Sequence, residues 1–148
     1  MRLHVKKFGG TSLATPAQIE NVAKHLHQFW SKGDSVVCVV SAMGTATDDL
    51  ANLAYQLNES PPLRELDMLL TAGERISMSL LGICLAKLGV PAISLTGSQS
   101  GILTDNVHGN ASIQEIKGDR ILQGIAEKKI VIVAGYQGMC LQNKEITT

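Results

Sequence analysis

Apolar residues follow two different periods along the chain. Residues 35–40 (SVVCVV) and 130–135 (IVIVAG) are apolar almost without interruption, which is typical of strands buried on both faces of a parallel sheet. Residues 3–8 and 90–97 also predict strands, the second with a glycine at its end. Between these stretches, apolar residues recur every three or four positions, as in helices that pack one side against a sheet.

The predicted helices have recognisable limits. Thr15 supplies a capping hydroxyl directly before Pro16, which favours the first helical position, and Gly33 ends the helical spacing that follows. More helical patterns come later, at residues 48–57, 63–88 and 119–128. The longest of them is expected to divide near residues 71–73. Strands that alternate with helices predict an α/β fold with a mainly parallel sheet covered on both faces.

Four glycine-bearing loops follow strands or lie close to them. They are FGGTS (8–12), SAMG (41–44), LTGSQSG (95–101) and AGYQG (134–138). In a parallel α/β sheet, ligands bind at the carboxyl ends of the strands. We therefore expect the four loops to converge on one edge of the sheet, where they would form a binding site.

Charge and composition limit the kinds of ligand that this site could bind. The 148 residues fit one domain, and thirteen basic residues balance thirteen acidic ones. No overall charge therefore attracts nucleic acid or an anionic membrane, so any anion site must be local. Aromatic residues make up 3% of the chain, which argues against base-stacking surfaces. The apolar runs look too short to span a bilayer.

Cysteine and histidine give no sign of a metal site. Cys38, Cys84 and Cys140 are odd in number and far apart, and the four histidines are scattered. We expect reduced, mostly buried thiols in a cytoplasmic protein. No metal ligand is predicted in this chain.

The first loop has the composition of a phosphate site. Lys7 ends the first strand, Gly9 and Gly10 allow a bulky anion close to the backbone N–H groups through left-handed conformations, and Thr11 and Ser12 add hydroxyl donors. Donors aimed at a transferring phosphoryl group are what a kinase needs. The spacing fits neither a P-loop nor GxGxxG. Taken alone, however, Gly-Gly after a strand is more often a plain turn.

Two further segments carry candidate binding groups. Ser41, Thr45 and Thr47 surround Gly44 just before a helix, where hydroxyls and free N–H groups suit a carboxylate or phosphate, or simply cap the helix. Glu74 lies in an otherwise apolar stretch. It either complements the dipole of a new helix or binds a cation such as a substrate ammonium group.

Six segments together resemble one family. They are KFGGTS (7–12), VVSAMG (39–44), TAGERIS (71–77), GILTD (101–105), AGYQG (134–138) and EITT (145–148). Their order and combination resemble the aspartokinases, within the amino acid kinase family. The resemblance covers the whole chain and implies a three-layer sandwich around a mainly parallel sheet.

The resemblance implies ATP-dependent phosphorylation of the side-chain carboxylate of L-aspartate, the first step towards lysine, threonine and methionine. Lys7 would contact the ATP phosphates and stabilise the transition state. Gly9, Gly10, Thr11 and Ser12 would complete the phosphate site. The substrate residues would be Ser41, Thr47 and Glu74, with Glu74 on the aspartate ammonium group. Mg²⁺ would bind through the nucleotide.

The chain also departs from the pattern of this family. The family continues past EITT with an LGRGGSD-like segment, a nucleotide-base lobe and usually ACT regulatory domains. We therefore expect residues 1–148 to be the N-terminal, aspartate-binding part of a truncated kinase domain, inactive alone. The alternative is a shortened, non-catalytic paralogue that binds aspartate or pairs with a full-length subunit. A homo-oligomer stays open, whereas a dinucleotide-binding domain would need a GxGxxG motif that the chain lacks.

Overall fold

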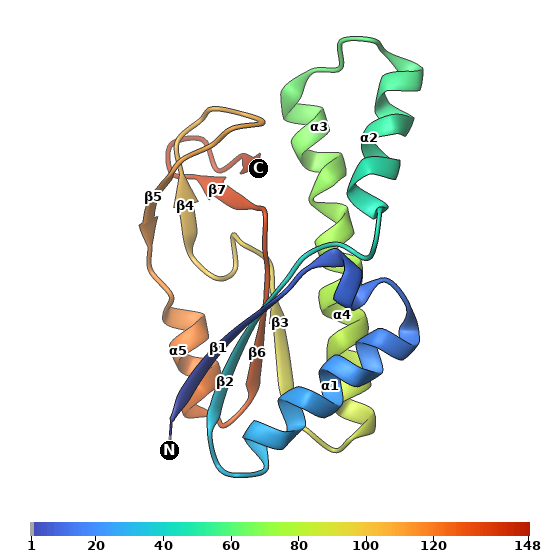
Figure 1. Cartoon of the computed structure of the whole chain (residues 1–148). Coiled ribbons are helices and arrows are strands. Elements are labelled where there is room, and N and C mark those ends of the chain that lie inside the picture. The colour runs from blue at the N-terminus through green and yellow to red at the C-terminus, as the bar shows by residue number, and fades with distance from the viewer. Residues whose placement is uncertain (1) are drawn as a thin grey trace.

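The computed structural model describes residues 2–148. Its centre is a parallel sheet with strand order β1-β2-β6-β3, formed by Leu3–Phe8, Ser35–Val40, Ile130–Ala134 and Ala92–Leu95 (Figure 1). The pairing is regular, with Val5 beside Val37 and Val39 beside Val133. All four strands predicted from the apolar pattern are confirmed, and all pair in parallel.

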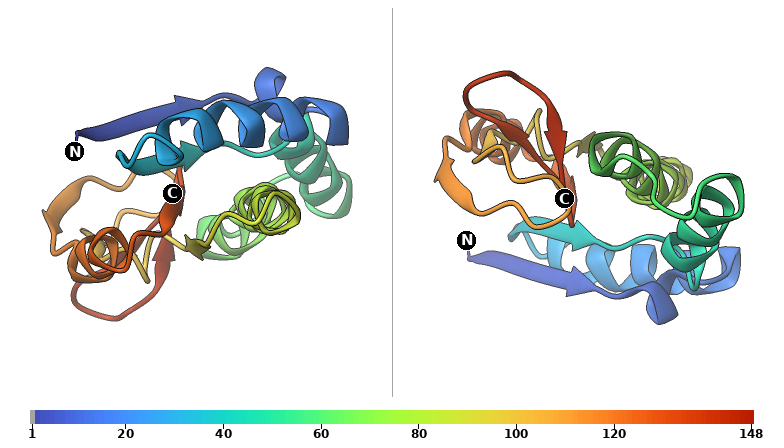
Figure 2. Two further views of the ribbon diagram at one scale, coloured as in Figure 1. Left: turned by 90° about the horizontal axis from the view of Figure 1, so that it is seen from below. Right: turned by 90° about the horizontal axis from the view of Figure 1, so that it is seen from above.

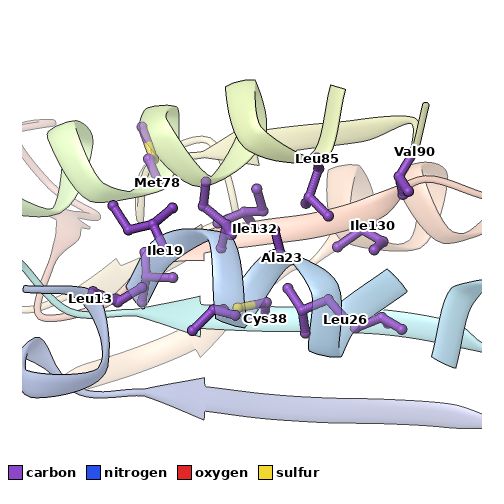
Figure 3. Close-up of a cluster of buried hydrophobic side chains, with 14 of the residues drawn as sticks. Leu13, Ile19, Ala23, Leu26, Cys38, Met78, Leu85, Val90, Ile130 and Ile132 are labelled. Atoms are coloured by element: carbon purple, nitrogen blue, oxygen red, sulfur yellow. The ribbon is translucent and has the colours of Figure 1, made fainter. Parts of the chain in front are cut away.

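Helices cover both faces of this sheet. α1 (Pro16–Trp30) and α4 (Ala72–Lys87) pack on one face, and α5 (Asp119–Ala126) packs on the other (Figure 2). Successive residues of β2 and β6 point to opposite faces, so each strand contributes to both apolar clusters. Figure 3 shows the larger cluster, in which Ile132 and Leu85 are fully buried. The predicted three-layer α/β architecture is confirmed for this sheet.

The helix limits agree closely with the sequence pattern. The Thr15 hydroxyl accepts a hydrogen bond from the Gln18 N–H at 3.3 Å, and Gly33 has a left-handed φ of 82° just after α1. α2 (Ala46–Leu57) begins two residues before the predicted start. α3 (Leu63–Leu70) and α4 divide at Thr71, as expected. The segment that follows β1 forms a short 3₁₀ helix, Gly10–Leu13.

A second sheet was not predicted. Its order is β5-β4-β7-β8, from Ile113–Ile116, Ile102–Thr104, Gly138–Cys140 and Ile146–Thr147. Only β4 and β7 pair in parallel. Strands of two to four residues are too short to establish a period of two, so the pattern could not reveal them. Because β7 follows β6 after three residues, this sheet lies beyond the carboxyl end of the first (Figure 1).

The segment Leu63–Lys87, which comprises α3 and α4, is long and apolar enough to cross a membrane by length and composition. This differs from the expectation that the apolar runs are too short to span a bilayer, because polar residues divide this run in the sequence. In the fold, 44% of its most apolar window is buried, and Leu81 and Leu85 of α4 lie in the core. We therefore assign this segment to the core of the α/β domain.

The three cysteines are free thiols, and two of them, Cys38 and Cys140, are buried. Burial raises the pKa of the Cys38 thiol to about 12, so Cys38 stays protonated and unreactive at neutral pH. This supports the prediction of reduced, mostly buried thiols.

Candidate active site

A cleft of about 380 Å³ lies at the carboxyl ends of β1, β2 and β6. Its lining brings together four residues that the sequence singled out, and three that it did not: Lys7, Ser41, Thr47 and Glu74, with Val39, Gly135 and Tyr136. They come from the carboxyl ends of β1, β2 and β6 and from the first turns of α2 and α4, as expected of a site at this edge. Two of the four glycine loops, SAMG and AGYQG, therefore line the cleft. The first loop reaches it only through Lys7, which precedes FGGTS, so the expected convergence of all four loops is confirmed only in part.

The fourth loop, LTGSQSG, takes a supporting place instead. The Gly97 N–H faces the Gln137 side-chain oxygen at 3.4 Å. A Cβ on Gly97 would lie 2.1 Å from the Gln137 carbonyl oxygen, so only glycine allows this approach. The loop thus packs against the segment after β6, and none of its residues lines the cleft.

Glu74 is the most unusual group in the cleft. Its side chain belongs to the first turn of α4, yet the residue is only 2% exposed. Oε1 accepts a hydrogen bond from the Ala42 N–H at 3.2 Å, whereas Oε2 is buried without a hydrogen-bond partner among the described residues. Burial raises the pKa of Glu74, because the carboxylate loses hydration that the backbone N–H groups of Glu74 and Ala42 do not fully replace.

An orphaned buried carboxylate oxygen is costly, so such atoms in native proteins usually have an unseen partner. A cation in the cleft would satisfy Oε2 and stabilise the ionised form. Complementing the helix dipole, the other interpretation of Glu74, would not require burial. The burial therefore favours the hypothesis that Glu74 binds a cationic group.

A buried polar stripe runs along α3 and α4 on the side that faces the loops. It consists of four residues spaced three or four apart, each at most 2% exposed: Asp67, Thr71, Glu74 and Ser77. Asp67 accepts hydrogen bonds from the Gly109 N–H, His108 and Thr148, and so attaches α3 to the second sheet. The Thr71 carbonyl accepts from the Gln137 side chain at 3.3 Å. The polar stripe thus ties several loops to one helical segment.

Lys7 is the only cationic residue among the described residues that line the cleft. It is solvent-exposed, and within residues 2–148 it makes no salt bridge. Lys6, its neighbour, points to the other face of the sheet, where its ammonium lies 4.5 Å from the centre of the Phe29 ring. The free ammonium of Lys7 is therefore available for an anion.

Gly9 and Gly10 differ from the expectation. Neither adopts the left-handed backbone proposed from the sequence, because the chain turns directly into the right-handed 3₁₀ helix. A Cβ on Gly9 would meet nothing within 4 Å, so this position is open to a ligand. A Cβ on Gly10 would lie 2.8 Å from the Gly44 carbonyl oxygen. Gly10 is thus required for close packing of two loops, which also share a Gly44 N–H to Gly10 C=O hydrogen bond.

Thr11 and Ser12 lie farther along the 3₁₀ helix and do not line the cleft. Ser12 borders a shallow depression on the outer side of β1 with Phe8 and His25. Their place in a phosphate site stays a prediction. Thr45, which the sequence groups with Ser41 and Thr47, does not line the cleft. Its hydroxyl donates to the Asp49 carboxylate at 3.0 Å in the first turn of α2.

Tyr136 is the main residue of the cleft that received no role from the sequence. It is about half exposed, and its φ of 60° is a left-handed conformation that non-glycine residues rarely adopt. The signal that could have pointed to it was its position in AGYQG, directly after a fully buried strand.

Comparison with known proteins identifies the family. The amino acid kinase family model matches residues 2–147. The aspartokinase of Mycolicibacterium smegmatis is 47% identical over all 148 residues, which cover 35% of that protein. The chain thus spans about a third of the length of this relative.

Solved structures agree. Aspartate kinase from Synechocystis matches with a TM-score of 0.81 and 43% identity, over 100% of this chain and 23% of that one. Escherichia coli aspartokinase III, solved with aspartate and ADP, has a TM-score of 0.84 at 19% identity, over 100% of this chain and 43% of that one, and supports the fold alone. With a cleft at the expected strand ends and relatives of this kind, the chain belongs to the amino acid kinase family and resembles its aspartokinases over its whole length.

Proposed function

We propose that this chain supplies the aspartate- and phosphate-binding part of an aspartate kinase. The reaction transfers the γ-phosphoryl group of ATP to the side-chain carboxylate of L-aspartate and yields 4-phospho-L-aspartate and ADP. The single observation that carries the proposal is the Oε2 atom of Glu74, buried in the cleft without a partner among the described residues. An amino acid brings the ammonium group that this oxygen lacks.

The rest of the cleft fits the remaining groups of the substrates. Ser41 and Thr47 offer hydroxyl donors for a carboxylate, close to Glu74 in the lining. Lys7, in the same lining, offers a free ammonium for phosphate oxygens. Escherichia coli aspartokinase III, which has a similar fold, was solved with aspartate and ADP, and we propose the corresponding substrates for this cleft.

The chemistry needs few protein groups. An oxygen of the aspartate side chain attacks the γ-phosphorus, the bond from that phosphorus to the bridging oxygen breaks, and ADP leaves with the electron pair. Charge spreads over the phosphoryl oxygens in the transition state, where Lys7 would stabilise it. Mg²⁺ would neutralise the phosphates when bound with ATP. Residues 2–148 contain no cluster of three His, Cys, Asp or Glu residues that could hold it independently.

A second candidate function is aspartate binding without phosphoryl transfer. A non-catalytic paralogue would need only the Glu74 cleft, whose buried Oε2 has no partner among the described residues. We also propose that residues 1–148 alone do not turn over, because phosphoryl transfer depends on complete positioning of both substrates.

The test uses two proteins: residues 1–148, and the full-length protein that contains them. Each is assayed with ATP and L-aspartate, and the acyl phosphate is trapped as its hydroxamate. Activity near a typical kinase rate of about 1–100 s⁻¹ in the longer protein only is the expected result. Aspartate binding without turnover in both proteins would favour the paralogue. Neither binding nor turnover in either protein would contradict the proposed function.

A further inference from the structure

The peptide unit between Ser41 and Ala42 is held at both ends by α4. Its N–H, on Ala42, donates to Oε1 of Glu74 at 3.2 Å. Its C=O, on Ser41, accepts from the Ser77 hydroxyl at 2.7 Å. A peptide unit is planar, with N–H and C=O pointing in opposite directions, so these two bonds fix its orientation about the chain axis.

Ser77 is well placed to act through this peptide. It lies one turn after Glu74 in the polar stripe and is 0% exposed. Its hydroxyl also lies 3.2 Å from the Glu74 carbonyl, the usual partner for a serine inside a helix, but the shorter bond goes to Ser41. The hydroxyl therefore connects the helix that carries Glu74 to the loop that carries Ser41.

The orientation of this peptide decides which oxygen of Glu74 is free. With the N–H directed at Oε1, Oε2 is the oxygen left without a partner. If the peptide turned, the Ala42 N–H would leave Oε1, and the carboxylate would lose the contact that ties it to the Ser41 loop. Ser41 itself lines the cleft, so the same turn would displace a second binding group.

We propose that Ser77 is a positioning residue for the ammonium-binding subsite. By holding the Ser41 carbonyl, it orients the Ser41–Ala42 peptide so that Oε1 of Glu74 is occupied and Oε2 faces the substrate. This inference rests on the proposed function. It assigns a role to a side chain that does not line the cleft and touches no substrate.

The experiment measures KM for L-aspartate, KM for ATP and kcat in the full-length protein carrying Ser77→Ala. Removing one buried hydrogen bond should let the peptide turn and raise KM for aspartate about 5- to 10-fold, since tenfold corresponds to about 1.4 kcal/mol. KM for ATP should change less than about twofold, because Lys7 and Gly9 lie outside this contact. Hydrogen exchange of the Ala42 amide should become faster in the variant.

The matched control is Ser79→Ala. Ser79 lies on the same helix and also donates to a carbonyl at 2.7 Å, but that carbonyl belongs to Arg75 in its own helix, and the residue is exposed. All three kinetic constants should stay at their original values. Ser77→Cys nearly keeps the buried volume and donates a weaker hydrogen bond, so it should raise KM for aspartate less than Ser77→Ala does.

A merely structural Ser77 would lower the melting temperature and leave KM for aspartate within about twofold of the unmodified protein, and that result would overturn the inference. So would equal effects of Ser77→Ala and Ser79→Ala. Failure of the proposed function is distinguishable, because the unmodified protein would then show no aspartate-dependent turnover at all. Either serine variant is interpreted only beside an active unmodified protein.

Discussion

Two regions of the site are built in opposite ways. In the first region, Glu74 is buried and hydrogen-bonded to Ala42, and Ser77 holds the same peptide, so its geometry exists before any ligand arrives. In the second region, Lys7 lines the cleft, is exposed and is free of salt bridges within residues 2–148. Gly9, two residues later, has open space where a Cβ would be. The first region is pre-organised, whereas the second offers charge and access.

The difference matches the two substrates that we propose. A small amino acid is recognised by its ammonium group, which requires a fixed partner in a site with little water. A nucleotide phosphate carries several charges and is stabilised by a mobile ammonium and free backbone N–H groups. Substitutions in the two regions should therefore have different effects. Those at Glu74 should weaken aspartate binding, whereas those at Lys7 should lower the rate of phosphoryl transfer.

The largest effect is expected at Lys7. Lys7→Ala should lower kcat by about 10²- to 10³-fold, or roughly 3–4 kcal/mol, since one cationic donor to the charge of the transition state is lost. KM for aspartate should change little. Lys6→Ala is the matched control, because Lys6 lies over Phe29 on the other face of the sheet. Steady-state kinetics of the full-length protein decide the matter, and an unchanged kcat would remove Lys7 from the mechanism.

Glu74→Gln should give the complementary result. Glutamine keeps the size and the acceptor for Ala42 but loses the charge, so KM for aspartate should rise about 10- to 100-fold, the equivalent of a charge-assisted hydrogen bond. Glu65→Gln serves as control, since Glu65 is also an acid in the first turn of a helix, but an exposed one. A rate that collapses at constant KM would instead assign Glu74 to catalysis.

Substitutions of the two glycines of the first loop should distinguish an effect on packing from an effect on ATP binding. Gly10→Ala should lower the free energy of unfolding by about 1–3 kcal/mol, because its Cβ would meet the backbone of residues 42 and 44. Gly9→Ala should change it by less than about 0.5 kcal/mol and should raise KM for ATP. Chemical denaturation measures the first effect and initial rates the second. Equal destabilisation by both variants would show that the loop contacts described here do not decide stability.

The smallest effect concerns pH and stability. Burial raises the pKa of Glu74, so the folded protein holds this proton at a pH where the unfolded chain has released it. The stabilisation from Glu74 is therefore complete below its ordinary pKa and is lost as pH rises through the raised value. Without ligand, the melting temperature of Glu74→Gln relative to the unmodified protein should be higher at pH 8 than at pH 4. A constant difference would show that Glu74 is not desolvated.

How much of the fold the sequence could predict depends on the length of each apolar pattern. Six-residue apolar runs such as 35–40 identify a buried strand, and Thr15-Pro16 marks a helix start, so the first sheet and its helices were predictable. The second sheet has strands of two to four residues, with no period to detect. Its place depends on long-range contacts such as those of Asp67 with residues 108 and 109.

The site shows the same limit at the level of single residues. Lys7 and Glu74 stand out as charges beside apolar segments, and the structure places both in one cleft. Gly9 and Gly10 are identical in sequence terms, yet one is open and the other is closely packed. Ser77 and Ser79 look alike in the sequence of the helix. Only the tertiary fold shows that the Ser77 hydroxyl donates to the Ser41 carbonyl, whereas Ser79 donates within its own helix.

The central claim, that Oε2 of Glu74 binds the substrate ammonium, is tested most directly by comparing L-aspartate with succinate. Succinate has both carboxylates and no ammonium group. Binding of each to the full-length protein is measured by calorimetry, with and without Glu74→Gln. We expect the unmodified protein to prefer aspartate by about 10- to 100-fold and the substitution nearly to abolish this preference. A preference that survives Glu74→Gln undiminished would contradict the claim, because the ammonium group would then be recognised elsewhere.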